Sequence, residues 1–345
     1  MTVTSVVVGV DGSPEADDAL VWALEEARLR GVPVHAVNVR NPGGGHTQGE
    51  RLAAPRAVAE HRARIGDEFA AHVRNVVELN AATEVPVTTE VRYGRPTEEL
   101  IHEACADALL VVGSRGRGRL AGSLLGSVSQ STIRYSRGPV VVVRGRRTRP
   151  AAARVVVGVD GSPGSVGALR FAHDAAVDRG ATLRVLHAWT LPYMGFAGAA
   201  ALPQEAIDDL SAQAAATLRD TVRRAGVDET RAPVETRLVQ GPPAPALLEA
   251  AENADLLVVG SRGHGGWKGL LPGSVSARSA VRATSPVAVV RADGERRGVP
   301  SRTWGAGEGT VAARHGGGQS REATFLASST TMATSPARSA GALSS

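Results

Sequence analysis

Residues 111–129 read VVGSRGRGRLAGSLLGSVS, and residues 258–276 repeat almost the same pattern as VVGSRGHGGWKGLLPGSVS. Each copy begins with an apolar run, continues with Gly-Ser-Arg-Gly and, after nine further residues, ends in Gly-Ser-Val-Ser. An apolar run without polar interruption is typical of a buried parallel strand. The glycines after it allow backbone N–H groups to approach a ligand closely, because glycine has no Cβ atom.

The second Gly-Ser of each copy, at Gly126 and Gly273, predicts the start of a helix. The free N–H groups and the positive dipole end of a helix N-terminus favour an anion. Strand, glycine loop and helix N-terminus together predict a phosphate-binding cradle in each copy. Glycines that merely form tight turns are the alternative, but a full spacing that occurs twice behind the same kind of strand favours the cradle.

The duplication extends beyond this motif. VVVGVDGSP occurs at residues 6–14 and again at 155–163. These two copies lie almost as far apart along the chain as the two glycine motifs do. A chain of 345 residues corresponds to about two domains of roughly 150 residues each. The predicted domains are 1–146 and 154–293, and a basic, proline-containing linker at 147–153 joins them.

Composition restricts the class of protein further. The net charge of +5 falls largely in residues 294–345, which are rich in Gly, Ser, Thr, Ala and Arg and are predicted to be a disordered tail. The charge of the remaining chain therefore does not argue for a nucleic-acid partner. The single cysteine, Cys105, excludes an internal disulfide framework and is predicted to be a small buried residue. With no signal-peptide pattern and no apolar stretch near ~18 residues, we expect a cytoplasmic protein outside the membrane.

Strands and helices are predicted to alternate along both copies, which favours right-handed crossovers and a parallel sheet. Asp11 and Asp160 follow the first strand of each copy, and each glycine loop follows the fourth. If these strands are neighbours, carboxylate and cradle face one crevice.

The predicted strands are 6–10, 34–39, 85–91, 109–112 and 140–143, then 155–159, 183–188, 234–239, 256–259 and 287–290. The predicted helices include 57–79, 96–106 and 242–252, with others that start at Pro14, Ser127 and Pro163.

Two loops and two histidines are further candidates. The loop at 41–49 is rich in glycine, and the apolar loop at 189–203 is predicted to lie over a ligand. His35 and His187 are interpreted as packed or capping residues. Acid–base chemistry is the alternative, but the sequence provides no accompanying nucleophile.

These motifs carry a resemblance to a known family. Gly-x2-Gly-x9-Gly-Ser, found twice and each time downstream of a VVVGVDGS strand, resembles the tandem, ATP-binding type of universal stress protein over about residues 3–293. The resemblance implies two tandem five-stranded parallel-sheet α/β sandwiches of Rossmann-like, adenine nucleotide alpha hydrolase-like fold, with strand order 3-2-1-4-5. It also implies ATP, alone or with Mg2+, in each domain, although no acidic cluster for the ion is visible.

The resemblance also implies a set of site residues, carried over by motif position. Asp11 and Asp160 are implied to meet the ribose or the adenine. The residues implied to lie near the base are Gly9, Val10 and Ala36 in the first copy and Gly158, Val159 and Ala188 in the second. The residues implied to hold the phosphates are Val112, Gly113, Gly116, Gly126, Ser127, Val128 and Ser129, and then Val259, Gly260, Gly263, Gly273, Ser274, Val275 and Ser276.

Three functions compete at this point. The first is a nucleotide-dependent regulator or sensor in the stress response, without fast catalysis and with a protein partner that the sequence does not identify. The second is a slow ATPase or a phosphoryl or nucleotidyl transferase, although neither copy contains the Gly-Lys-Ser/Thr of a Walker A loop. The third is a scaffold that binds no nucleotide, against which the intact glycines argue.

The short apolar strands at 140–143 and 287–290 predict how the copies assemble. Each is the last strand of its sheet, and an exposed strand edge pairs readily with another edge. The resemblance to the family also implies pairing there. We expect either a homodimer or a pseudo-dimer within one chain.

Overall fold

The computed structural model describes residues 3–40, 55–105, 107–117, 125–145, 153–191, 203–263 and 273–291. The predicted loop at 41–49, most of the loop at 189–203 and the predicted tail at 294–345 lie outside the described residues. Most of the predicted linker also lies outside them, so the limits of the domains and of the linker stay predictions.

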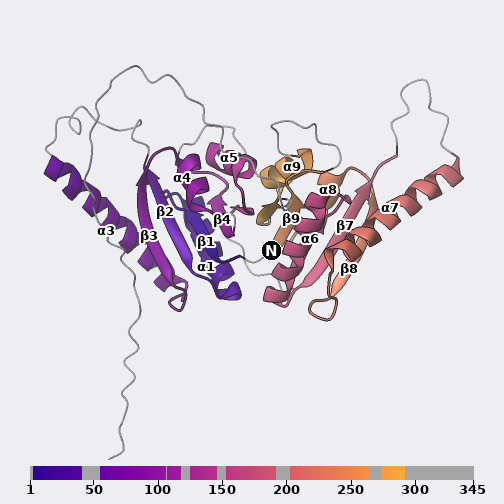
Figure 1. The fold of residues 1–345 in the computed structure, drawn as a ribbon, viewed down its shortest axis with the longest axis horizontal. Coiled ribbons are helices and arrows are strands. Elements are labelled where there is room, and N and C mark those ends of the chain that lie inside the picture. Colours follow the sequence, from indigo (N-terminus) through magenta and orange to yellow (C-terminus); the bar gives the residue numbers. More distant parts are fainter. Residues whose placement is uncertain are drawn as a thin grey trace, which may run out of the picture.

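Strands and helices alternate through the chain, as the hydrophobic pattern predicts (Figure 1). The first half contains β1 (Ser5–Gly9), α1 (Pro14–Arg30), β2 (Val34–Arg40), α3 (Pro55–Leu79), β3 (Val87–Tyr93), α4 (Pro96–Glu103), β4 (Ala108–Gly113), α5 (Ser127–Tyr135) and β5 (Val140–Val143). The second half contains β6 (Arg154–Gly158), α6 (Pro163–Arg179), β7 (Thr182–Trp189), α7 (Gln204–Ala225), β8 (Val234–Gln240), α8 (Pro243–Ala250), β9 (Leu256–Gly260), α9 (Ser274–Arg282) and β10 (Val287–Val290).

Several elements differ from their predicted limits by one to three residues, β3 and α4 among them. The strand predicted at 85–91 begins at Val87, because Pro86 before it has no N–H group to donate to the ladder. The helix predicted at 96–106 ends at Glu103, and Cys105 beyond it is exposed rather than buried. Cys105 therefore contributes nothing to the core. Among the described helices, none combines the length and the hydrophobicity that crossing a bilayer requires.

The strands form one sheet of ten, in the order β3-β2-β1-β4-β5-β10-β9-β6-β7-β8. Within each half the order is the predicted 3-2-1-4-5, and the strands are parallel. The two five-stranded units join into one sheet, because β5 and β10 pair antiparallel with Val141 opposite Ala288, which is the intrachain alternative of the predicted pairing. The pairing lies within one chain and leaves neither of these strands with a free edge.

Helices cover both faces of this sheet, so the molecule has three layers. One hydrophobic core lies under α1, α3, α6 and α7. The other lies under α4, α5, α8 and α9. Both cores continue through β5 and β10, since alternate residues of these strands point to opposite faces. The halves therefore share their apolar interior, and Figure 1 shows them side by side with α3 and α7 at the outer ends.

A buried ion-pair network joins the two halves where α1 meets α6. Glu26 of α1 is fully buried and accepts hydrogen bonds from Arg30, at 2.5 Å between Nε and Oε1, and from Arg179 of the other half. Arg30 also lies 3.4 Å from the carboxylate of Asp178 and stacks over Phe171 of α6. Burial raises the pKa of the Glu26 carboxyl, but Arg179 and Arg30 lower it by more, so the net shift is downward. Glu26 is therefore held as a carboxylate between two arginines.

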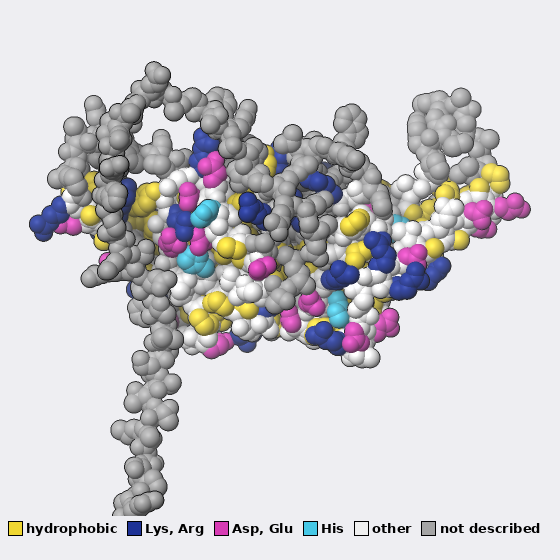
Figure 2. Space-filling view, viewed as in Figure 1, with side chains coloured by type: hydrophobic (Ala, Val, Ile, Leu, Met, Phe, Trp, Pro, Cys, Tyr) yellow, Lys and Arg dark blue, Asp and Glu magenta, His cyan; other side chains and the backbone are white. Residues whose placement is uncertain are grey.

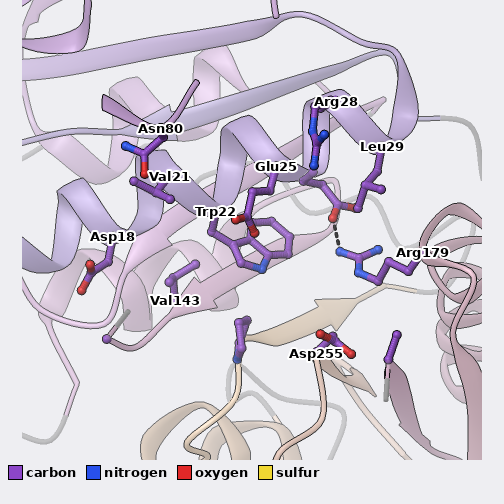
Figure 3. A pocket seen from close by; sticks show the side chains of 14 residues that line it. Asp18, Val21, Trp22, Glu25, Arg28, Leu29, Asn80, Val143, Arg179 and Asp255 are labelled. Atoms are coloured by element: carbon purple, nitrogen blue, oxygen red, sulfur yellow. Dashed lines mark hydrogen bonds and ion pairs between the residues drawn. The ribbon is translucent and has the colours of Figure 1, made fainter. Parts of the chain in front are cut away.

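A cavity of about 340 Å³ lies beside this network, between α1 and the second half (Figure 3). Trp22 and Glu25 line it from α1, whereas Asp255 and Arg179 line it from the second half. Asp255 already accepts a hydrogen bond from the backbone N–H of Arg154, at 2.6 Å. The cavity thus belongs to the junction between the halves, and no described residue of the glycine loops lines it.

Candidate functional site

An aspartate connects the first strand of the first half to its glycine loop. β1 and β4 are neighbours, as the crevice hypothesis requires. Asp11 follows β1, and its Oδ1 accepts hydrogen bonds from the backbone N–H of Ser13 at 3.0 Å and from its Oγ at 2.6 Å. The other oxygen, Oδ2, accepts the backbone N–H of Arg117 in the glycine loop at 2.8 Å. Asp11 therefore fixes the loop after β4 against the turn after β1.

The second half repeats this arrangement. Asp160 accepts hydrogen bonds from the N–H of Ser162 at 3.0 Å and from its Oγ at 2.6 Å. A Cβ atom added at Gly263 would lie only 2.0 Å from Asp160 Oδ2, and one added at Gly116 would lie 2.5 Å from Asp11 Oδ2. Glycine is required at these two positions because the carboxylate occupies the space of a side chain.

The first and third glycines of the motif have different surroundings. A Cβ at Gly113 would lie 2.6 Å from the backbone oxygen of Glu15, so close packing of β4 on α1 excludes any side chain. The nearest atoms to a Cβ at Gly126 lie at 3.4 Å, which is ordinary contact. None of the motif glycines has a positive φ angle, whereas Gly12 and Gly161, in the turns after β1 and β6, have φ angles of +81° and +85°. The motif therefore needs glycine where neighbouring atoms lie too close for a side chain, and not because its backbone is left-handed.

The helices after the two glycine loops have open N-termini. α1 and α6 are each capped by a serine side chain, Ser13 at 3.3 Å and Ser162 at 3.2 Å from the N–H three residues on. α5 and α9 instead follow Gly126 and Gly273, and no side chain of the described residues caps either helix. The first N–H groups of an α-helix have no partner within the helix, so these two N-termini are suited to an anion.

The serines at the start of α5 and α9 divide into two kinds. Ser129 and Ser276 are buried and bind backbone carbonyls, Ser129 Oγ at 2.7 Å from the oxygen of Gly113. Ser127 and Ser274 are exposed at the first position of each helix. The buried pair therefore holds helix and loop together, while the exposed pair is available to a ligand.

Positive charge gathers beside the first glycine loop. Arg115 is exposed within the loop, and Arg144 is half-buried just after β5. Burial, and after it the positive charge of Arg115, lower the pKa of the Arg144 guanidinium. The Arg144 guanidinium is engaged with the backbone oxygen of Val281 at 2.7 Å, so of the two Arg115 is the cation that belongs to the loop itself.

The residues predicted to line the base lie at the ends of β1 and β6, with one exception. Val10 and Val159 are buried just beyond these strands. Gly9 and Gly158 lie against Leu100 of α4 and Leu247 of α8, where an added Cβ would come within 2.9 Å and 2.7 Å of a leucine methyl. The absence of a side chain at Gly9 and Gly158 therefore allows α4 and α8 to pack closely on the sheet.

The exception concerns Ala36 and Ala188, which do not occupy equivalent positions. Ala36 is fully buried opposite Val8, in the middle of β2, whereas Ala188 lies near the end of β7. The prediction paired them because each follows a histidine. Strand register depends instead on the pattern of buried side chains, which shifts the alignment by three residues, so that Val39 is the residue equivalent to Ala188.

The residue equivalent to His187 is Asn38, which the sequence interpretation overlooked. Asn38 Nδ2 donates to the backbone oxygen of Val10 at 2.6 Å, and His187 Nδ1 lies 2.7 Å from the backbone oxygen of Val159. Both side chains are buried, which confirms that His187 is a packed histidine. The sequence signal for Asn38 is a polar residue near the end of the otherwise apolar strand VHAVNVR.

His35 belongs to a separate polar cluster on β2, β3 and α4. Its Nδ1 lies 2.7 Å from Thr88 Oγ1, and its Nε2 lies 3.2 Å and 3.4 Å from carboxylate oxygens of Glu90 and Glu103. His35, Glu90 and Glu103 bring one ring nitrogen and two carboxylates within 4.8 Å of one another, away from the glycine loop. Figure 2 shows acidic, basic and histidine side chains gathered on this face of the first half. Arg92 already pairs with both glutamates, so the cluster has its own cation.

Replacing Ser13 with alanine tests whether the aspartate turn stabilises the fold. Ser13→Ala removes both the cap of α1 and a partner of Asp11, and we expect a loss of about 1–2 kcal/mol in the free energy of unfolding. Urea denaturation measures the loss. Ser127→Ala, at an exposed serine, is the matched control, and we expect it to stay within about 0.5 kcal/mol of the parent protein. Equal effects of the two changes would contradict this role of Ser13.

Two tandem α/β halves, each with an aspartate-anchored glycine loop and an open helix N-terminus, define the class of protein. Residues 2–144 and 152–291 both match the universal stress protein family. The chain therefore belongs to the universal stress protein family and contains two of its domains in tandem.

Its relatives include tandem proteins of similar length. A universal stress protein of Mycobacterium bovis is 35% identical over 308 residues, spanning 83% of this chain and 94% of that protein. One of Mycolicibacterium smegmatis is 37% identical over 296 residues, spanning 83% of this chain and 96% of that protein. The solved structure of a universal stress protein from Archaeoglobus fulgidus covers 83% of this chain and 98% of its own, with a TM-score of 0.59 and 21% identity. That structure shares the fold.

Proposed function

We propose that each half binds an adenine nucleotide, ATP in the first place, with its phosphates at the glycine loop and at the N-terminus of α5 or α9. One observation carries the proposal: the helix after each glycine loop begins directly at a motif glycine, and among the described residues no side chain caps its first N–H groups. A ligand with several anionic oxygens satisfies such free N–H groups.

The residues around each loop have separate tasks in this proposal. The aspartates hold the loops, the buried serines hold the helices, and Ser127 and Ser274 donate to phosphate oxygens. Asp11 Oδ1 already accepts two hydrogen bonds, whereas Oδ2 accepts one; a carboxylate oxygen accepts a second hydrogen bond, so a ribose hydroxyl can still bind at Oδ2. Mg2+, if it accompanies ATP, is bound through the phosphates, since the His35 cluster lies toward the other end of β2.

Catalysis is not part of the proposed function. Of the histidines predicted as candidates, His187 is engaged with the backbone oxygen of Val159, and His35 is engaged with Thr88, Glu90 and Glu103. A general base has to reach the group that it deprotonates. We therefore propose a regulator whose occupancy by nucleotide is transmitted to a protein partner. Site-dependent release of ADP at a rate of turnovers per second would show an enzyme instead.

The direct test is to count bound nucleotide. Freshly purified protein is denatured, and the released nucleotides are identified and quantified per chain by ion-pair chromatography. We expect close to two ATP per chain after incubation with ATP and Mg2+, and micromolar affinity corresponds to about −8 kcal/mol per site. One nucleotide per chain would show that the halves have diverged. No uptake at all would refute the proposed function and leave a scaffold.

Assembly and location are proposed more briefly. Since β5 and β10 pair within the chain, we propose a pseudo-dimer that is a monomer in solution, and the mass from light scattering checks this. A cytoplasmic location, which the single cysteine favours, is checked by fractionation of cells.

A further inference from the structure

Each half of the molecule ends in an arginine that reaches into the other half. Arg291, just after β10, is buried and donates to the backbone oxygen of Ile133 at 3.1 Å and to that of Arg134. Arg144, just after β5, donates to the backbone oxygen of Val281 at 2.7 Å. These carbonyls belong to the last turns of α5 and α9, so the two contacts cross between the halves.

The antiparallel pairing of β5 and β10 explains the crossing. In an antiparallel pair the end of one strand lies beside the start of the other. The residue after β10 therefore emerges beside the segment that leads into β5, which is the end of α5. The residue after β5 emerges beside the end of α9 for the same reason. The crossing contact occurs twice because the two halves of the chain are copies of each other.

The two helices that receive these arginines are the helices whose N-termini form the candidate cradles. The last carbonyls of a helix have no partner within it, and a cation there stabilises the helix through both hydrogen bonds and the dipole. α5 and α9 have only nine residues each, a length at which a helix depends on its surroundings. Their first helical hydrogen bonds, from Gln130 to Gly126 and from Ala277 to Gly273, end on the cradle glycines.

We propose that Arg291 and Arg144 are positioning residues for the nucleotide sites of the opposite halves. Arg291 holds α5 and so sets the cradle at Gly126, and Arg144 holds α9 and so sets the cradle at Gly273. Each site is then complete only when the other half is docked beside it. This inference rests on the proposed function for the ligand, but the positioning itself can be measured without one.

Hydrogen exchange on the full chain tests the positioning. Arg291→Met keeps much of the buried stem and removes the charge, and we expect the amides of α5 to exchange roughly three- to tenfold faster while those of α9 change less than twofold. Arg144→Met is expected to give the opposite pattern. Arg291→Lys, which retains a cation, is expected to restore part of the protection. The exposed Arg137→Met is the control and leaves both helices unchanged.

Binding of ATP, the probe, tests the consequence for the sites. In a Gly263→Ala background, where only the first cradle is intact, Arg291→Met is expected to weaken binding roughly three- to tenfold and Arg144→Met less than twofold. In a Gly116→Ala background the two arginine variants exchange roles. Isothermal titration calorimetry measures both backgrounds.

The outcomes are distinct for the two proposals. A crossed pattern in exchange and in binding supports the positioning roles. Equal effects of both arginine variants on both helices, or no effect on either, would overturn them, since a general loss of stability does not select one helix. If the parent protein takes up no ATP, the proposed function fails, while the exchange pattern still decides whether each arginine positions the opposite helix.

Discussion

Replacing Glu26 with glutamine is expected to lower the free energy of unfolding by about 3–5 kcal/mol, because removing one member of a buried ion pair leaves its partners uncompensated. Arg30 and Arg179 both pair with this fully buried carboxylate, one from each half. Urea denaturation, followed by tryptophan fluorescence and by circular dichroism, measures the change.

The control for this substitution is the neighbouring residue on α1. Glu25 is exposed, and Glu25→Gln is expected to change stability by less than about 0.5 kcal/mol. A loss below about 1 kcal/mol for Glu26→Gln would show that water or relaxation compensates the two arginines. In that case the network would not be a main contact between the halves.

The same network predicts a dependence of stability on pH. The pKa of Glu26 is lower in the folded protein, since Arg179 and Arg30 outweigh the effect of burial. A lowered pKa contributes stability that is complete above the ordinary pKa of a glutamate, about 4.3, and that is lost as the pH falls through the folded value. The difference in the free energy of unfolding between the parent protein and Glu26→Gln is therefore expected to be constant above about pH 4.3 and to shrink as the pH falls from there through the folded pKa of Glu26.

Gly263→Ala is expected to weaken nucleotide binding in the second half by at least tenfold, or about 1.4 kcal/mol. The added Cβ would lie 2.0 Å from Asp160 Oδ2, so the loop or the aspartate has to move. Counting the nucleotide that stays bound per chain after free nucleotide has been removed is expected to show a fall from two toward one. Gly116→Ala is expected to give the same loss in the first half, where the distance is 2.5 Å.

The control for both substitutions is Gly66→Ala in α3. A Cβ at Gly66 would meet no atom within 4 Å, and alanine favours a helix over glycine, so we expect unchanged binding and equal or higher stability. Unfolding curves separate a loss of binding from a loss of fold. Full occupancy of both sites in Gly263→Ala, with its fold intact, would contradict the placement of the phosphates at the glycine loop.

The fold was largely predictable because its signals are local. Apolar runs, helix caps such as Ser13 and the repeat of a whole domain specify the strands, the helices and the order 3-2-1-4-5 without knowledge of distant contacts. The contact between Asp11 and the loop was also predictable, since the ends of neighbouring parallel strands meet at one edge of a sheet.

The register of the strands and the surroundings of individual side chains were less predictable from the sequence. The pairing of His35 with His187 followed a shared dipeptide, whereas the register of β2 and β7 makes Asn38 the equivalent residue. The cluster of His35, Glu90 and Glu103 joins residues far apart in the sequence, and no local pattern indicates it. Cys105 was expected inside because cysteine is often buried, yet the helix ends before it.

The sequence by itself determined that the chain has two equivalent halves, each with a strand, a glycine loop and a helix N-terminus suited to phosphate. Only the tertiary structure decided that β5 and β10 join the halves into one sheet, and that Glu26, Arg144 and Arg291 each act across the junction. The reason is physical. Periodicity and caps report on neighbours along the chain, while the junction depends on which strand edges are free to pair and on which charges that pairing buries.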